Sequence, residues 1–333
     1  MNSPAEQMPS ADLLKRCAET WRLSNLLFVR KMENIVFSCD SDAGKVYLRL
    51  TTPLRRARPE IEAEIHWVEH LAQCGLKVPK IIPNREGKKI ASFTEGEQHF
   101  EAVVFGALYG EHPSKEDASN PKFLKQLEAL IAKMHRAFLK YEGLHAGMKR
   151  EEWWEERGLR HALTAAASSK EHALKKRLEE AVAQMRQLPR TPENYGLVHA
   201  DLGALNLFIE EDNSIGIIDF DDSCYHWFVF DLAIVIFSMA NRFSHATPLP
   251  EEMKWLGLLL EGYRTVRPLN EEEVELIPQL IEFACLRLYF WIEYHEGLQT
   301  FHEDALEKVA NIKLWLKKRL HSDNRPLSNL RLC

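Results

Sequence analysis

Short apolar runs in the first hundred residues alternate in the way that is typical of strands. Residues 34–39 (NIVFSC) and 45–50 (KVYLRL) are rich in apolar and β-branched side chains, and a DSDAG turn joins them. Two such runs around a glycine-containing turn predict a β-hairpin. Residues 88–93 and 99–108 return to strand character. The chain is therefore expected to begin with a small, mixed α/β region.

One helix is expected within this region. Residues 59–75 begin with a proline and end with a glycine. Between them, apolar side chains recur at intervals of three and four residues, at Ile61, Ile65, Val68 and Leu71. This spacing places them on one face and predicts an amphipathic helix.

The pattern becomes mainly helical after Gly110. Residues 121–141 carry an apolar helical face, residues 151–187 are charged and helix-prone, and residues from about 227 to 320 follow helical periods. Three short strands interrupt the helices, at residues 197–199, 207–210 and 215–219. An EDNS turn joins the last two strands into a hairpin.

These patterns predict an α+β protein with two lobes. The small mixed lobe would occupy residues 1–105 and the mainly helical lobe residues 106–333, with the connection near residues 105–110. A chain of 333 residues is long for one hydrophobic core and comfortable for two.

Composition narrows the possible partners and surroundings. Apolar residues make up 45% of the chain and charged residues 28%, as in ordinary globular proteins. A net charge of −6 argues against nucleic acid as the main partner. The first ten residues lack a signal peptide pattern, and no apolar run approaches the ~20 residues that span a membrane. None of the six cysteines forms a CxxC pair, so we expect reduced thiols in a cytoplasmic protein. The oligomeric state is not indicated.

The candidate chemistry lies around the predicted hairpin. Asn206 comes directly before its first strand and Asp219 ends its second, so the hairpin would bring the two together. Their oxygens are the hard ligands that Mg²⁺ prefers. Asp201 lies on the preceding loop, where a carboxylate can orient and accept the proton of an attacking hydroxyl. One base and two metal ligands form a set suited to phosphoryl transfer. The alternative is that these acids are surface caps of a hairpin.

The form HxDxxxxN followed by IDFD resembles the aminoglycoside phosphotransferase, choline kinase and homoserine kinase superfamily. The letters match strongly over residues 197–233. The resemblance implies a protein-kinase-like fold, with ATP and Mg²⁺ as cofactors. It also implies that Asp231 braces the catalytic loop, although an acid at a helix N-terminus is the alternative. His199 lies on an apolar strand, and we expect it to orient the loop by hydrogen bonds rather than to carry a proton.

A kinase-like enzyme must hold ATP in its small lobe. The superfamily pattern assigns Arg49 to the phosphates and Glu64 to an ion pair with that cation, with Glu60 and Glu62 as alternatives. Each of these charges could instead be solvated. Four residues are the expected contacts of adenine along a strand and hinge: Val104, Phe105, Gly106 and Ala107.

The small lobe lacks a GxGxxG loop. Residues 31–34 are expected to cover the phosphates instead. The basic run at residues 54–58 (LRRAR) could contact phosphate or substrate, but we expect a solvated loop there.

The phosphate acceptor is not specified by the sequence. Acids mixed with aromatic residues at 151–158, 221–228 and 288–297 suit a cationic amine, although the same mixture is ordinary on half-buried helices. The candidate acids are Asp221, Asp222 and Glu293.

Two classes of function stay open. The favoured class is transfer of the γ-phosphate to a hydroxyl of a small molecule such as an aminoglycoside, choline or homoserine. A protein serine/threonine kinase of the bacterial stress-response type is its alternative. The second class is a nucleotide-binding pseudokinase, against which the intact set Asp201, Asn206 and Asp219 argues.

Overall fold

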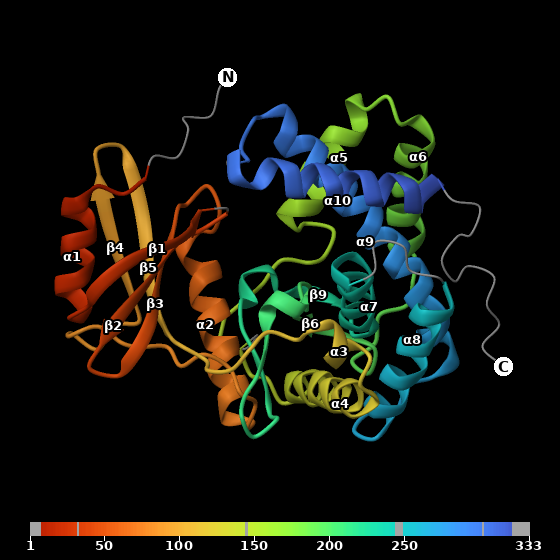
Figure 1. The fold of residues 1–333 in the computed structure, drawn as a ribbon, viewed down its shortest axis with the longest axis horizontal. Helices are drawn as coiled ribbons and strands as arrows, with labels where there is room; N and C mark the ends of the chain where they lie inside the picture. The colour runs from red at the N-terminus through yellow and green to blue at the C-terminus, as the bar shows by residue number, and fades with distance from the viewer. Residues whose placement is uncertain (1–7, 32, 144–145, 244–248, 302, 322–333) are drawn as a thin grey trace. The chain divides into compact units, whose positions relative to one another are not determined.

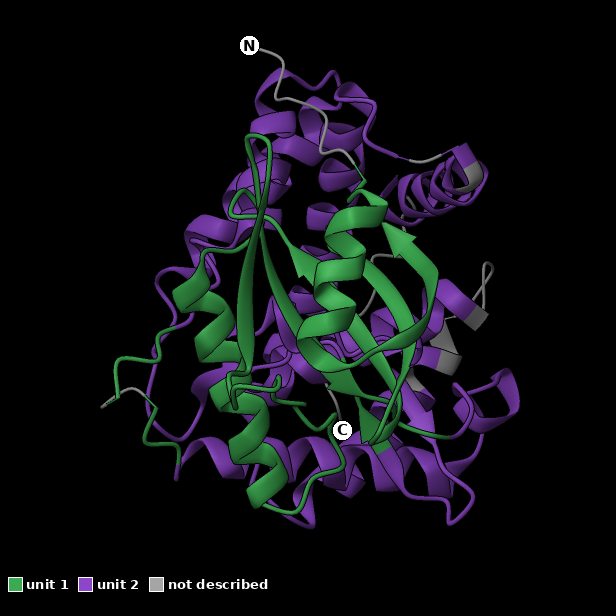
Figure 2. Cartoon of the chain, turned by 90° about the vertical axis from the view of Figure 1, so that its left-hand side faces the viewer, with its two compact units in different colours: residues 1–109, 141–149, 216–218 green, residues 110–140, 150–215, 219–333 purple. Residues whose placement is uncertain are grey.

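The structure is a computed structural model that describes residues 8–31, 33–143, 146–243, 249–301 and 303–321. The chain divides into two compact units, which Figure 2 shows in different colours. Unit 1 consists of residues 1–109, 141–149 and 216–218, and unit 2 consists of residues 110–140, 150–215 and 219–333. The first segment of unit 1 ends shortly after residue 105, and two short later segments join it.

Unit 1 is built on a five-stranded antiparallel sheet with strand order β1-β2-β3-β5-β4. Its strands are β1 (Ser24–Lys31), β2 (Ile35–Ser41), β3 (Gly44–Thr51), β4 (Ile90–Glu95) and β5 (Gln98–Gly106). Its helices are α1 (Ala11–Trp21) and α2 (Arg58–Gln73).

The two helices of unit 1 cover opposite faces of the sheet (Figure 1). Leu13 of α1 belongs to the same core cluster as Leu48 of β3, whereas Ile61 of α2 clusters with Val103 of β5. Successive residues of a strand point to opposite faces. Arg49, which follows Leu48, therefore points to the side of the sheet that α2 covers.

The expectation of a single helix in this region is wrong, because the structure also contains α1. Strand β1 was not predicted either. A signal for α1 was present: Leu13, Cys17 and Trp21 recur every fourth residue and are buried. Ser10 caps the helix by accepting a hydrogen bond from the Leu13 amide at 3.2 Å. Strand β1 is mostly exposed and shows no alternation of buried and exposed side chains, so its sequence carries little strand signal.

Unit 2 is mainly helical. Its helices are α3 (Lys115–Ala118), α4 (Pro121–Phe138), α5 (Arg157–Ser168), α6 (His172–Met185), α7 (Val229–Phe243), α8 (Leu249–Arg264), α9 (Glu271–Gly297) and α10 (Glu303–His321). The long helix α9 packs against α5, α6, α7 and α10, and α4 packs against α8. Among the described residues, no helix is both long enough and apolar enough to cross a membrane.

The short strands form two separate pairs. Strands β7 (Leu207–Ile209) and β8 (Ile215–Ile217) make the predicted hairpin. Strand β6 (Tyr195–Val198) pairs instead with β9 (Cys224–Trp227), which the sequence analysis did not predict. Two 3-10 turns complete this region, η1 (Ala204–Asn206) and η2 (Phe220–Asp222). Residues 199–206 therefore form the connection between β6 and β7.

Candidate active site

The loop that follows β6 is anchored on Asp231, in the first turn of α7. The backbone amides of His199 and Ala200 donate to its two carboxylate oxygens at 3.0 and 2.9 Å. Ala200 has φ +67°, a left-handed conformation that alanine rarely adopts. Two charge-assisted hydrogen bonds from consecutive amides offset the cost of this conformation. They fix the backbone directly before Asp201.

Asp231 is itself held by a buried network that the sequence analysis missed. His135 of α4 contacts the Asp231 carboxylate through Nε2 at 3.0 Å and the Tyr263 hydroxyl of α8 through Nδ1 at 2.8 Å. Burial is the main cause that lowers the pKa of His135, so the ring is neutral. A neutral imidazole has one donor and one acceptor. These partners fit donation to Asp231 and acceptance from Tyr263. The only sequence signal was a histidine on the apolar face of a helix.

Asp201 and Asn206 lie in direct contact. Asn206 Nδ2 donates to both the backbone carbonyl and the Oδ2 atom of Asp201, each at 2.8 Å. The Asp201 amide in turn donates to His199 Nδ1 at 3.3 Å. His199 is fully buried and Asp201 is exposed. The loop thus presents one carboxylate to a ligand and holds it through two buried side chains.

Negative charge is concentrated around this carboxylate. Although Asp201 is exposed as a residue, the surrounding protein desolvates its carboxylate, and this desolvation, followed by the charges of Asp222 and Asp219, raises the pKa of Asp201 to about 7. The hydrogen bond from Asn206 and the charge of Arg287 act in the opposite direction. Neighbouring carboxylates repel one another unless a cation binds close to them or one of them takes up a proton. The arrangement therefore favours a bound cation.

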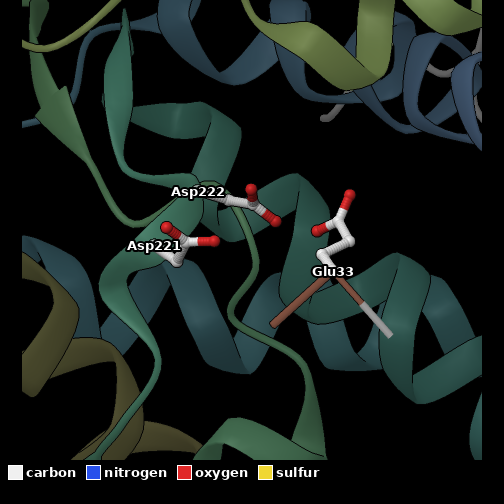
Figure 3. A group of neighbouring side chains, drawn as sticks. All are labelled: Glu33, Asp221 and Asp222. Atoms are coloured by element: carbon white, nitrogen blue, oxygen red, sulfur yellow. The ribbon is translucent and has the colours of Figure 1, made fainter. Parts of the chain in front are cut away.

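Asp219 is the second residue after β8 and directly precedes turn η2. Its backbone has φ +64° and ψ +66°, a left-handed conformation that aspartate tolerates better than most residues. Asp221 and Asp222 are the next acids of the turn, on consecutive residues (Figure 3). Arg150 holds the backbone of this turn by donating to the carbonyls of Ser223, at 2.8 Å, and Asp221.

The donor set fits a divalent metal. Both side-chain hydrogen bonds of Asn206 to Asp201 use its Nδ2 atom, which leaves the carbonyl Oδ1 as an available hard ligand. Asp219 supplies carboxylate oxygens, and its charge contributes to the raised pKa of Asp201. One amide and one carboxylate leave room for water and phosphate oxygens around Mg²⁺. Asn206 and Asp219 are the residues that would hold the metal.

In unit 1, Arg49 and Glu64 form a buried, bidentate ion pair. The two guanidinium nitrogens donate to the two carboxylate oxygens at 2.8 and 2.6 Å, and the side chains are only 7% and 1% exposed. The guanidinium also lies 4.8 Å from the ring centre of Phe105. The sequence-based pairing of Arg49 with Glu64 is present in the structure.

The two alternatives to Glu64 bind other groups. Glu60 accepts from the Ala57 amide at 2.7 Å and from Arg56 at 3.3 Å. Glu62 accepts from Arg58 Nε at 3.0 Å on the surface.

The basic run at residues 54–58 is not the solvated loop that the sequence analysis expected. The side chains of Arg55 and Arg56 are 5% and 2% exposed. Arg55 pairs at 2.6 Å with Glu33, inside the segment predicted to cover the phosphates, of which residue 32 lies outside the described residues. Buried guanidinium groups need such partners, and only the tertiary structure supplies them.

The predicted adenine contacts lie at the end of β5. The Gly106 amide donates to the Lys80 carbonyl at 2.8 Å and the Ala107 amide to the Lys45 carbonyl at 3.0 Å. Val104 accepts from the Ile82 amide at 2.9 Å, and the register pairs Phe105 with Tyr47. An adenine bound here would therefore use backbone groups other than these two amides.

Glu293, the third acid predicted for the acceptor site, lies on α9 and not on turn η2, which carries Asp221 and Asp222. Both carboxylate oxygens of Glu293 accept from Ser169 Oγ, at 3.1 and 3.2 Å. A residue that the sequence analysis did not single out, Arg287 of the same helix, lies within electrostatic reach of Asp201 and Asp222. Its counter-ion is Glu156, at 3.1 Å.

A family model described as the phosphotransferase enzyme family (APH) matches residues 28–269. Among curated proteins, the chain is 26% identical over 291 residues to an amicoumacin kinase of Bacillus subtilis (strain 168), covering 86% of this chain and 85% of that protein. It is 28% identical over 256 residues to a homoserine kinase of Rhizobium etli, covering 74% of each.

Solved structures share the fold. An amicoumacin kinase in complex with AMP-PNP, Ca²⁺ and Ami superposes with a TM-score of 0.81 at 24% identity, over 96% of this chain and 95% of that chain. A microcompartment-associated aminopropanol kinase gives a TM-score of 0.73 at 22% identity, over 96% and 100%. A spectinomycin phosphotransferase gives 0.64 at 13% identity, over 96% and 97%. The kinase-like fold expected from the sequence is confirmed.

Proposed function

The chain belongs to the phosphotransferase enzyme family, and from this premise we propose that it transfers the γ-phosphate of Mg·ATP to a hydroxyl group of a small molecule. The observation that carries the proposal is the exposed carboxylate of Asp201, which Asn206 holds at 2.8 Å beside Asp219 and Asp222. Phosphoryl transfer depends on positioning and charge neutralisation, and this arrangement supplies a base together with a metal-binding pair.

Each residue has a defined task in this reaction. Asp201 accepts a hydrogen bond from the acceptor hydroxyl, aims its oxygen at the phosphorus atom and takes up its proton. Asp231 and His199 keep the loop in place through the bonds described above. When bound by Asn206 and Asp219, Mg²⁺ neutralises charge on the phosphate oxygens.

Unit 1 is the proposed nucleotide-binding part. Arg49 is held by Glu64 at 2.6 Å in one orientation, so a second interaction with the α- and β-phosphates costs little side-chain entropy. The segment from Val104 to Ala107 is proposed to contact adenine, and Arg55 is proposed to steady the phosphate-covering turn through Glu33. The neighbouring structure that contains AMP-PNP and Ca²⁺ supports the use of a nucleotide and a divalent metal.

The acceptor is proposed to be a small molecule. The relatives are named as kinases of two different compounds, amicoumacin and homoserine, so family membership alone does not choose between them. We also propose a cytoplasmic location, where ATP is abundant. The five described cysteines are free thiols, which suits a reducing compartment.

The first experiment is release of ADP from Mg·ATP across a panel of acceptors. The panel contains aminoglycosides, choline, ethanolamine, homoserine, sugars and a generic protein substrate. We expect turnover with a small hydroxyl compound and its loss in D201N, with ATP binding largely retained. D219A should instead weaken the binding of Mg·ATP itself.

The opposite results are equally informative. Near-normal turnover by D201N with the true acceptor would show that another group is the base. Phosphorylation of the protein substrate alone would make the chain a protein kinase, and ATP binding without any turnover would make it a pseudokinase.

A further inference from the structure

We propose that Arg287 binds a carboxylate group of the acceptor, so that the preferred acceptors are hydroxy amino acids rather than purely cationic amino alcohols. This inference rests on the proposed function of Asp201 as the base that receives the acceptor hydroxyl. It assigns to α9 a specificity-determining residue.

The guanidinium of Arg287 is fixed by a carboxylate that is itself fixed. Nε and Nη2 of Arg287 both contact Glu156 Oε2, at 3.1 Å. The same carboxylate caps α5, accepting from the amides of Gly158 at 2.6 Å and Leu159 at 2.9 Å. The packing is close, because a Cβ at Gly158 would lie 2.9 Å from Arg287 Nη2. A guanidinium held in this way loses little entropy when it binds a second anion.

Part of the guanidinium remains available. The Arg287 side chain is 22% exposed, whereas that of Glu156 is 6% exposed. Nη1 of Arg287 has no hydrogen-bond partner among the residues that the structure describes. An arginine presents its donors in a planar fork that matches a carboxylate. One edge of this fork is used by Glu156, and Nη1 is left for a ligand.

The helix that carries this cation contacts the strand that follows turn η2, because the ring centres of Phe283 in α9 and His226 in β9 lie 6.5 Å apart. Asp201 and Asp222 both act electrostatically on Arg287, and Arg287 in turn stabilises the charge of Asp201. The loop itself, DLGALN at residues 201–206, contains no lysine or arginine. A positive charge that acts on the base is therefore supplied by Arg287 of α9.

This charge pattern selects among acceptors. A purely cationic amino alcohol can place its ammonium group on Asp222, but it has no anion to offer the Arg287 guanidinium. A zwitterionic hydroxy amino acid can place its carboxylate on Arg287, its ammonium group on Asp222 and its hydroxyl on Asp201. The acids and aromatic residues of this region suit a cationic amine but left the acceptor unspecified in the sequence, and Arg287 was not among the candidates.

A second role for Arg287 makes a different prediction. If the guanidinium stabilised the transferring phosphoryl group, its removal would slow all acceptors equally. If it binds an acceptor carboxylate, its removal changes the ratio between acceptors with and without that group. Matched pairs of acceptors separate the two roles.

The experiment compares acceptor pairs that differ only in a carboxylate: L-homoserine with 3-aminopropan-1-ol, L-threonine with 1-aminopropan-2-ol, and L-serine with ethanolamine. In the wild-type protein, kcat/KM should favour the carboxylate member of the pair that is turned over. In R287Q, this preference should fall about ten- to a hundred-fold, the value of a hydrogen bond to a charged group. The loss should appear mainly in the KM of the carboxylate acceptor.

Two further variants guard against misfolding and unspecific effects. R287Q leaves Glu156 without its cation, so R287K, which keeps the charge but not the planar fork, should show a smaller fall in the same ratio. R177Q is the matched control. Arg177 pairs with Glu282 of α9 at 2.7 Å and has a similar exposure of 20%, and its loss should leave the ratio unchanged.

Several outcomes would overturn the inference. The first is that R287Q slows both members of a pair equally, so that the ratio of their kcat/KM values does not change. The second is that the wild-type protein prefers the amino alcohols. The third is turnover only with acceptors that lack a carboxylate, such as aminoglycosides. The last result would leave the proposed function intact. If nothing is turned over, calorimetry with Mg·AMP-PNP decides: binding of a carboxylate member that R287Q abolishes supports the inference, and no binding refutes it.

Discussion

The charged residues of the two units differ in their neighbours: the buried charges described in unit 1 form an ion pair, whereas Asp201 in unit 2 lies near other acids. In unit 1, Arg49 and Glu64 are both buried and form a bidentate pair, so their charges balance without any ligand. In unit 2, Asp201 lies among the charges of Asp222 and Asp219, which help to raise its pKa to about 7. The pair in unit 1 is complete as it stands. The acids in unit 2 lie close enough to raise the pKa of one of them, and a bound cation is proposed to neutralise them, as expected of a site that trades stability for function.

The largest expected effect tests the acid cluster. Asparagine tolerates the left-handed backbone at position 219, so D219N removes charge without strain. Loss of a residue that only supports a metal ligand typically lowers activity or metal affinity about 10–100-fold. Asp219 is proposed to bind the metal directly, so the turnover of D219N should fall by more than this. In EDTA, however, the unfolding temperature should stay the same or rise, because repulsion of Asp201 is relieved. A clear fall in that temperature would contradict this account of the cluster.

The next effect tests the balanced pair in unit 1. E64Q leaves the buried Arg49 without a counter-charge, which should cost about 3–5 kcal/mol of unfolding free energy. The matched control is E62Q, because Glu62 and Arg58 are 42% and 43% exposed and such pairs contribute about 0.3–0.5 kcal/mol. Urea denaturation measures both. Equal losses of unfolding free energy in E64Q and E62Q would show that the buried Arg49–Glu64 pair stabilises the protein no more than the exposed pair does.

A smaller effect is expected behind the catalytic loop. H135L removes one of the three groups that contact Asp231, and loss of a hydrogen bond to a charged group should cost about 1.5–3 kcal/mol. Y263F removes the hydroxyl that contacts His135 and that also accepts from Arg267 Nη1 at 3.0 Å, so it too should cost about 1.5–3 kcal/mol. Both are measured by urea denaturation together with turnover. If H135L kept full stability and turnover, the network would not be needed to hold the loop.

The smallest effect concerns Glu128 of α4, which is fully buried and whose carboxylate oxygens have no hydrogen-bond partner among the described residues. Burial, followed by the charge of Asp231, raises its pKa well above the ordinary 4.5. The folded state therefore holds a proton that the unfolded chain has already released above pH 4.5. The free energy of unfolding therefore falls as the pH rises from about 4.5 toward the pKa of Glu128 in the folded protein.

E128Q cannot ionise, so it should lack this loss. Between pH 5 and 6, wild-type stability should fall relative to E128Q by at most about 1.4 kcal/mol per pH unit. Thermal unfolding of both proteins across this range measures the difference. Parallel curves would show that Glu128 titrates alike in the folded and unfolded chains.

Features with a local cause were predicted well. The β7–β8 hairpin, helix α2 and the buried face of α4 follow from side-chain periods of two and about 3.6 residues, which neighbouring residues determine. The contact of Asp201 with Asn206 spans only five residues. The resemblance to the superfamily assigned Glu64 as the partner of Arg49, and the two are paired in the structure. Helix α1 was missed although its spacing was visible, and β1 because it is mostly exposed.

Features that depend on distant contacts were not predicted. The sequence analysis expected a solvated loop where Arg55 and Arg56 are buried, because a run of basic residues has no local reason to be covered. It did not pair β6 with β9, since two four-residue strands carry little signal of their own.

By itself, the sequence determined most of the elements, the spacing of Asp201, Asn206 and Asp219 and the chemistry that these residue types allow, because periodicity and short turns act over a few neighbouring residues. The tertiary structure decided which charges are balanced and which are not. His135 reaches Tyr263 across 128 positions and Asp231 across 96, and Arg287 reaches Glu156 across 131. The electrostatic free energy of a side chain depends on all the charges and the burial around it, and a folded chain brings these together from positions that no local pattern connects.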